Sequence, residues 1–194
     1  MPEPATERYT IRRKVFRLFG AGFHVHDPAG KVVAFCEQKA FRLREDLRVY
    51  TDDSKATEFF RIGTQQVLDF AATYTASLPD GQPLGSLRRK GLKSLLRDEW
   101  EVCGAGGEPL AVLREDSGAM AIFRRLADGV AWLSPQTFQM THADGRHLAT
   151  LRQHFNPFVY RLGVAIHAED PDIDDLLILA AACLVAAIEG RQSD

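Results

Sequence analysis

Clustered cations are the side chains in this sequence that point most directly to a chemistry. Residues 88–97 read RRKGLKSLLR, with five cations and no acid. Cations beside exposed leucines such as Leu92 and Leu95 suit an anionic lipid surface, where each cation contributes about 1 kcal/mol. A solvated turn, partly neutralised by Asp98 and Glu99, explains the same run without a ligand. The candidate head-group residues are Arg88, Arg89, Lys90, Lys93 and Arg97.

A second basic group lies on a predicted strand and consists of Arg12, Arg13, Lys14 and Arg17. Alternation along a strand places Arg13 and Arg17 on one face, and Arg12 and Lys14 on the other. If Arg12 or Lys14 faces outward near residues 88–97, the two groups together form a head-group site, because a phosphate requires convergent donors.

Two further patterns contain residues that ligate metals. The acidic run 169–175 offers Asp170, Asp172 and Asp174 as calcium candidates, but it lacks the mid-loop glycine and the final glutamate of an EF-hand. Acids at the start of a helix explain this run without a metal. The His24-x-His26 pair has a spacing compatible with zinc, yet no further Cys or His repeats it nearby. We therefore expect no metal and no cofactor.

The motifs of the common enzyme classes are missing. Ser117 lies in a Glu-Asp-Ser-Gly turn and not in a G-x-S-x-G elbow, and there is no P-loop, dinucleotide fingerprint or H-E-x-x-H. The three cysteines are 67 and 80 positions apart, which excludes a C-x-x-C pair. The sequence favours a protein that is not an enzyme.

The elements that position these residues belong to an ordinary globular chain. It has 194 residues, 45% of them hydrophobic and 26% charged, which predicts one domain. The net charge of −2 argues against a general nucleic-acid binder. Charges within the first twenty residues argue against a signal peptide, so we expect a cytoplasmic protein. The longest apolar run, residues 176–188, is shorter than the roughly 17–25 residues of a membrane-spanning helix.

Repeated hairpins predict the sheet. Glycine turns at residues 27–30, 79–81, 104–107 and 143–145 are flanked by alternating apolar residues. About a dozen strands result, a number that a closed barrel accommodates better than an open sheet. Besides the runs that flank these turns (23–26, 31–35, 100–102 and 110–113), the candidate strands are 9–18, 40–43, 47–51, 59–63, 67–70, 74–78, 121–126, 137–141, 147–153 and 159–167.

Two segments are predicted to be helical. Residues 91–97 form one or two amphipathic turns. The second helix runs from Asp172, a plausible N-cap, to Glu189, and Gly190 follows its end. Because its apolar side chains surround the axis, this helix must be enclosed on all sides. We therefore predict a mainly β fold, a closed antiparallel barrel of about twelve strands that encloses a hydrophobic C-terminal helix.

The order of these patterns resembles the tubby-like C-terminal fold, in its branch of LURP-one-related and phospholipid scramblase-like proteins. The resemblance runs from Tyr9-Thr10-Ile11-Arg12-Arg13-Lys14, through Phe23-His24-Val25-His26-Asp27 and the unit 138–151, to the final helix. It implies a disordered tail over residues 1–8 and one domain over residues 9–190, with its central helix at 173–189. The Cys-rich or Pro-rich flanking segment of the scramblases is missing.

The function that the resemblance implies is that of a non-enzymatic binding module. Its expected partner is an anionic phospholipid or phosphoinositide-like head group, bound reversibly through the basic patch from the cytoplasmic side of a membrane. The alternative is an intracellular protein-interaction or structural domain with a protein partner and no lipid ligand. No nucleic-acid partner is expected.

Overall fold

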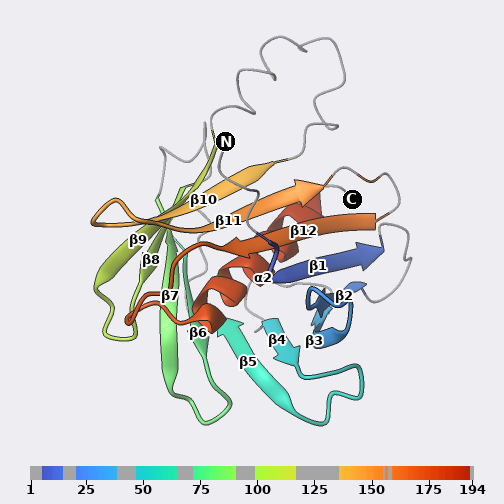
Figure 1. Cartoon of the computed structure of the whole chain (residues 1–194). Helices are drawn as coiled ribbons and strands as arrows, with labels where there is room; N and C mark the ends of the chain where they lie inside the picture. Colours follow the sequence, from blue (N-terminus) through green and yellow to red (C-terminus); the bar gives the residue numbers. More distant parts are fainter. Residues whose placement is uncertain are drawn as a thin grey trace.

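The chain folds into twelve β-strands and one helix over the residues described by the structure, a computed structural model (Figure 1). These residues are 6–14, 21–38, 47–64, 72–90, 99–116, 136–154, 156 and 159–192. The strands are β1 (Tyr9–Lys14), β2 (Ala21–His26), β3 (Val32–Gln38), β4 (Leu47–Tyr50), β5 (Glu58–Gly63), β6 (Thr73–Ser77), β7 (Pro83–Arg89), β8 (Glu99–Cys103), β9 (Pro109–Glu115), β10 (Thr137–His142), β11 (His147–His154) and β12 (Val159–Ile166), and the helix is α2 (Asp175–Gln192).

The sheet is a closed antiparallel barrel in which each strand pairs with its neighbours in the chain. The first and last strands complete it, in a register that runs from Tyr9 opposite Val164 to Lys14 opposite Val159. Closure leaves no edge strand exposed. The predicted fold class, a closed barrel of about twelve strands around a hydrophobic C-terminal helix, is confirmed.

The antiparallel order gives the barrel two distinct ends. The six connections that follow the even-numbered strands meet at one end, which we call the turn end. These connections are residues 27–31, 51–57, 78–82, 104–108, 143–146 and 167–174. The opposite end, where the odd-numbered strands finish and the even-numbered strands begin, is called the far end. The predicted glycine turns all lie at the turn end, where Gly30, Gly81, Gly107 and Gly145 have positive φ angles.

Helix α2 lies inside the barrel, against β12, β7 and β1 (Figure 1). Every residue from 177 to 187 is at most 4% exposed, so all sides of the helix are covered. Short alanine side chains fill much of this stretch and allow close approach to the wall. Gly85 of β7 shows how close: a Cβ at this position would lie 2.5 Å from the Cys103 carbonyl oxygen and 2.7 Å from Cδ2 of Leu177.

The helix begins two residues later than the predicted start at residue 173. Its N-cap is Asp174, whose Oδ1 accepts a 2.7 Å hydrogen bond from the Leu176 amide, and not Asp172 as the sequence suggested. Both aspartates precede the apolar run, and only the backbone geometry separates them. Asp175 in the first turn pairs with Arg8 at 2.8 Å, which fixes the start of β1 beside the helix N-terminus.

Several predicted elements can be compared with the strands only in part. The candidate strands 40–43, 67–70 and 121–126 and the short helix 91–97 lie outside the described residues. Strand β7 was not predicted, so Arg88 and Arg89 end a strand where the sequence suggested a turn. Glu7 and Arg8, assigned to a disordered tail, contact the barrel, and the Arg8 amide donates to the Val164 carbonyl at 2.8 Å. The division into a tail and one domain stays a prediction.

Candidate functional site

Charge is distributed unequally between the two ends of the barrel. The six turn-end connections carry ten Asp or Glu and three Lys or Arg. The three residues of each strand nearest the far end carry ten Lys or Arg and four Asp or Glu. The far-end cations are Arg12, Arg13, Lys14, Arg48, Arg61, Arg88, Arg89, Arg114, Arg152 and Arg161. The described part of the barrel therefore has an acidic end and a basic end, although the net charge of the chain is near zero.

Arg88 and Lys90 of the predicted basic patch lie on the outer face of the wall, where acids of β8 partly neutralise them. Arg88 pairs with Glu101 at 3.3 Å, and Lys90 pairs with Glu99 at 3.0 Å. Glu99 also accepts a 2.9 Å hydrogen bond from Nε of Arg114 on β9. Burial opposes the charge of Glu99, but these two cations outweigh it and lower the pKa of its carboxyl. The patch is thus a network of paired charges on β7, β8 and β9.

The other three residues of the patch differ in position. Arg89 points to the inner side at the far end, where its guanidinium carbon lies 5.6 Å from the centre of the Trp100 ring. This contact is a cation–π interaction with a side chain that is 3% exposed. Lys93 and Arg97 lie outside the described residues.

The second basic group is divided between the two faces of β1, as alternation predicts. Arg12 is exposed on the outer face, whereas Arg13 is 6% exposed, with its guanidinium carbon 6.0 Å from the centre of the Tyr160 ring. Lys14 is the last residue of β1, opposite Val159. Arg12 is therefore the member of this group that is shown to face solvent.

The two basic groups share an end of the barrel but lie on opposite walls. Five strands lie between β1 and β7 in either direction around the barrel. Twelve strands spaced about 4.8 Å apart give a diameter of roughly 20 Å. That separation is too great for one phosphate head group, so the suggestion that Arg12 or Lys14 joins Arg88–Lys90 in a single head-group site is not supported. One flat surface across the far end can contact both groups.

Two of the three calcium candidates in the acidic run, Asp170 and Asp174, have carboxylates that accept hydrogen bonds within the protein. Asp170 accepts hydrogen bonds from the Asp172 amide at 3.1 Å and from Arg146 at 2.7 Å, and Asp174 caps the helix. Burial opposes the charge of Asp170, but these hydrogen bonds outweigh it and lower its pKa. Across the described ranges, no group of three or more His, Cys, Asp and Glu is arranged to hold a metal ion.

The histidines form small polar clusters on the outer wall. His24 contacts Asp53 at 2.7 Å, while His26 contacts the Gly30 carbonyl at 3.1 Å. Near the turn end, the Thr150 hydroxyl lies 2.9 Å from Nε2 of both His147 and His167. Partial burial lowers the pKa of His167, and the neighbouring His147 adds to this effect. Each imidazole thus has a partner in the structure.

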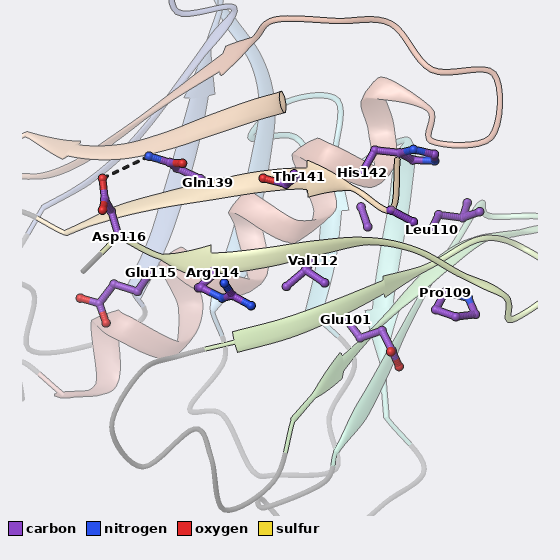
Figure 2. A pocket seen from close by; sticks show the side chains of 12 residues that line it. Glu101, Pro109, Leu110, Val112, Arg114, Glu115, Asp116, Gln139, Thr141 and His142 are labelled. Carbon is purple, nitrogen blue, oxygen red and sulfur yellow. Dashed lines mark hydrogen bonds between the residues drawn. The ribbon is translucent and has the colours of Figure 1, made fainter. Parts of the chain in front are cut away.

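A shallow groove of about 520 Å³ runs along β9 on the outer wall (Figure 2). Its apolar part includes Leu110 and Val112, between Glu101 of β8 and Thr141 of β10. At one end of the groove, Asp116 accepts a 3.1 Å hydrogen bond from Gln139, which is drawn as a dashed line in Figure 2. The lining of this groove contains no Ser or Cys, and Thr141 contributes its hydroxyl side chain.

A cluster around Glu7 was not predicted. Its carboxylate contacts His154 of β11 through Oε1 and the Thr10 hydroxyl through Oε2 at 3.2 Å, and it lies 3.6 Å from Arg161 of β12. It rests above Gly163, where a Cβ would come within 2.1 Å of Oε1. Glu7 and His154 are 147 residues apart, so no local sequence pattern joins them.

Comparison with known proteins agrees with this architecture. The family model described as LURP-one-related matches residues 32–186. No curated protein and no solved structure matches the chain. Among the described residues, no helix combines the length and the apolar character that crossing a membrane requires. Because the matched segment covers most of the barrel and the buried part of α2, the chain belongs to the LURP-one-related family, within the tubby-like superfamily.

Proposed function

We propose that this protein is a non-enzymatic module that binds anionic phospholipid membranes reversibly with the far end of its barrel. The observation that carries this proposal is the opposition between ten cations at the far end and ten acids in the turn-end connections. An anionic surface attracts the first end and repels the second, so the same charges provide both affinity and orientation.

The proposed contact residues are Arg88, Arg89 and Lys90 on one wall and Arg12 and Lys14 on the other, joined by Lys93 and Arg97 of the basic run. Each cation near an anionic leaflet contributes about 1 kcal/mol, reduced here by the ion pairs to Glu99 and Glu101. Because α2 fills the barrel, the ligand is bound on the outside of the protein.

Binding without catalysis agrees with the chemistry of the described surface. The acids and histidines near the groove are engaged by neighbouring side chains, as in Asp116 with Gln139 and His142 with Asp144 at 2.9 Å. A catalytic site requires a nucleophile or base aimed at a reacting atom, and the groove offers no such pair. The family's fold is in general that of a binding domain.

The alternative, a protein-interaction domain without a lipid ligand, requires an exposed apolar surface for its partner. In the part of the chain that the structure describes, Val32 is the only large hydrophobic residue that is exposed, with 37% of its surface accessible. This distribution favours electrostatic binding over apolar docking.

Sedimentation with liposomes tests the proposed function. We expect binding to vesicles of phosphatidylcholine with phosphatidylserine and none to phosphatidylcholine alone. Salt should release the protein, because the Debye length falls from about 10 Å at 0.1 M to about 3 Å at 1 M. Equal recovery in the supernatant with and without phosphatidylserine at low salt contradicts the proposal.

Paired variants test the orientation. Arg88→Gln with Lys90→Gln should weaken binding about tenfold, which corresponds to ~1.4 kcal/mol. The matched control, Lys31→Gln with Arg146→Gln, removes two cations from turn-end connections and should leave binding unchanged or slightly tighter. If the two double variants lose affinity equally, total charge rather than the far end determines binding.

A further inference from the structure

A row of four basic side chains crosses the outer wall over β2, β1, β12 and β11. Register pairs Arg12 with His24 on one side and with Arg161 on the other, and Arg161 with His154. Side chains that are directly opposite in neighbouring strands lie about 5 Å apart, and like charges in such positions repel each other. Arg12 and Arg161, the two charged members of this row, therefore require an anion nearby, whereas Asp53 contacts the row at its His24 end, at 2.7 Å.

Glu7 provides the anion at the other end of the row. Its carboxylate lies among donors from three strands: Thr10 on β1, His154 on β11 and Arg161 on β12. Gly163 forms the floor, since any larger residue would place a Cβ within 2.1 Å of the Glu7 oxygen. We call this arrangement of Thr10, His154, Arg161 and Gly163 the Glu7 niche.

Arg161 is only loosely engaged by Glu7. The nearest of its nitrogens is 3.6 Å from the carboxylate, which is beyond hydrogen-bond distance. Its Nε is buried and has no hydrogen-bond partner within the described chain. A guanidinium binds oxyanions best through two parallel hydrogen bonds. A phosphate group has more oxygens than a carboxylate, so it can form these two bonds with Arg161 while it also accepts hydrogen bonds from other donors.

We propose that the Glu7 niche is a phosphate-binding site and that Glu7 occupies it as an internal competitor. A phosphate that enters would accept hydrogen bonds from Thr10, His154 and Arg161 and would displace the Glu7 side chain. Arg12, exposed beside Arg161, adds positive charge next to the bound group. The niche deepens the proposed membrane function if the phosphate belongs to a lipid head group, but its existence does not depend on that function.

Displacement does not require the barrel to unfold. Arg8, the next residue, is held by its amide hydrogen bond to Val164 and by its ion pair with Asp175, both at 2.8 Å. Rotation of the Glu7 side chain alone can therefore vacate the niche while β1 stays paired. If Glu7 leaves the niche only part of the time, the apparent dissociation constant for phosphate equals the intrinsic constant divided by the fraction of molecules in which the niche is free.

Titration of the full-length protein with inorganic phosphate, followed by NMR shifts of backbone amides, tests the proposal. Glu7→Gln should bind phosphate about fivefold more tightly than the parent, which equals ~1 kcal/mol. The shifts should be greatest at residues 152–154 and 161–163. Adding Arg161→Gln to Glu7→Gln should abolish the gain.

Two matched controls separate the niche from general charge effects. Glu169→Gln removes one exposed acid at the turn end, and Arg48→Gln, in the Glu7→Gln background, removes one outer-wall arginine on β4. Neither should alter phosphate affinity relative to its background. If Glu7→Gln binds no more tightly than Glu169→Gln, or if the shifts lie elsewhere, the proposal is overturned.

Vesicles then identify the source of the phosphate. A gain for Glu7→Gln on phosphatidylcholine vesicles with phosphatidic acid, in addition to inorganic phosphate, assigns the niche to a lipid head group. A gain with inorganic phosphate alone assigns it to a soluble phosphate. Because the inorganic titration contains no membrane, failure of the niche is distinguished from failure of membrane binding.

Discussion

Replacement of Gly85 by alanine tests how closely helix α2 is fitted to the barrel wall. The φ angle of Gly85 is +149°, in a region that L-residues rarely adopt. The new Cβ would also lie 2.5 Å from the Cys103 carbonyl oxygen and 2.7 Å from Leu177. Backbone strain costs about 1–3 kcal/mol and overpacking about 1–3 kcal/mol, so we expect a loss of about 2–6 kcal/mol in the free energy of unfolding.

Thermal unfolding, followed by far-ultraviolet circular dichroism, measures this loss. At about 2.1 cal/mol/K per residue, the unfolding entropy of a chain this long is about 0.4 kcal/mol/K, so the melting temperature should fall by about 5–15 °C. Gly81→Ala is the matched control: its φ is +92°, but a Cβ there meets no atom within 4 Å. It should therefore show backbone strain without overpacking.

The difference in melting temperature between Gly85→Ala and Gly81→Ala measures the overpacking between the helix and the wall. If Gly85→Ala melts within about 2 °C of Gly81→Ala, the close packing of helix and wall is refuted. A double variant with Leu177→Ala should recover part of the overpacking loss beyond simple additivity, because it removes Cδ1 and Cδ2 of Leu177, two of the three atoms nearest to the new Cβ.

Three further predictions concern the helix and the histidines. Leu184→Asp places a charge on a fully enclosed helix, which costs several kcal/mol, and should abolish the native circular dichroism spectrum. If this variant instead melts like the parent protein, the helix is not enclosed. Asp174→Ala removes the N-cap and should lower the free energy of unfolding, measured in urea, by about 0.5–2 kcal/mol, and Asp172→Ala should lower it by less. If Asp172→Ala causes the larger loss, Asp172 is the N-cap, as the sequence suggested. Because the pKa of His167 is lowered in the folded protein, the unfolded chain takes up a proton at this residue first, and stability should fall as the pH decreases through about 6.5. Thermal unfolding of His167→Gln should show a smaller dependence of stability on pH. An identical pH dependence in the two proteins would rule out this contribution of His167.

The enclosed helix could be predicted because its signal is local. Leucine, isoleucine, valine and alanine surround its axis, and a surface helix would show one apolar face. The exact start of the helix could not be predicted, because Asp172 and Asp174, only two residues apart, are both suitable caps. Strand β7 was missed because its sequence, PLGSLRR, contains a glycine and ends in two arginines, which resemble a loop. Only its pairing with β6 and β8 gives it strand geometry.

The Glu7 niche could not be predicted from sequence, because it depends on closure of the barrel. Register alone places Arg12 beside Arg161 and Arg161 beside His154. The opposition of charge between the two ends, in contrast, had a signal that was available. Once an antiparallel meander is predicted, alternate connections belong to the same end, and those at the turn end are acidic.

The order of elements along the chain has a consequence for biosynthesis. The strand that closes the barrel against β1 and the helix that fills the core leave the ribosome after β1 to β11. Until residue 187 has emerged, strands β1 to β11 have neither a central packing partner nor a closed sheet, and their inward side chains are exposed to water. Folding of this domain must therefore follow synthesis of helix α2, and until then the unpaired strands expose apolar surface that favours aggregation.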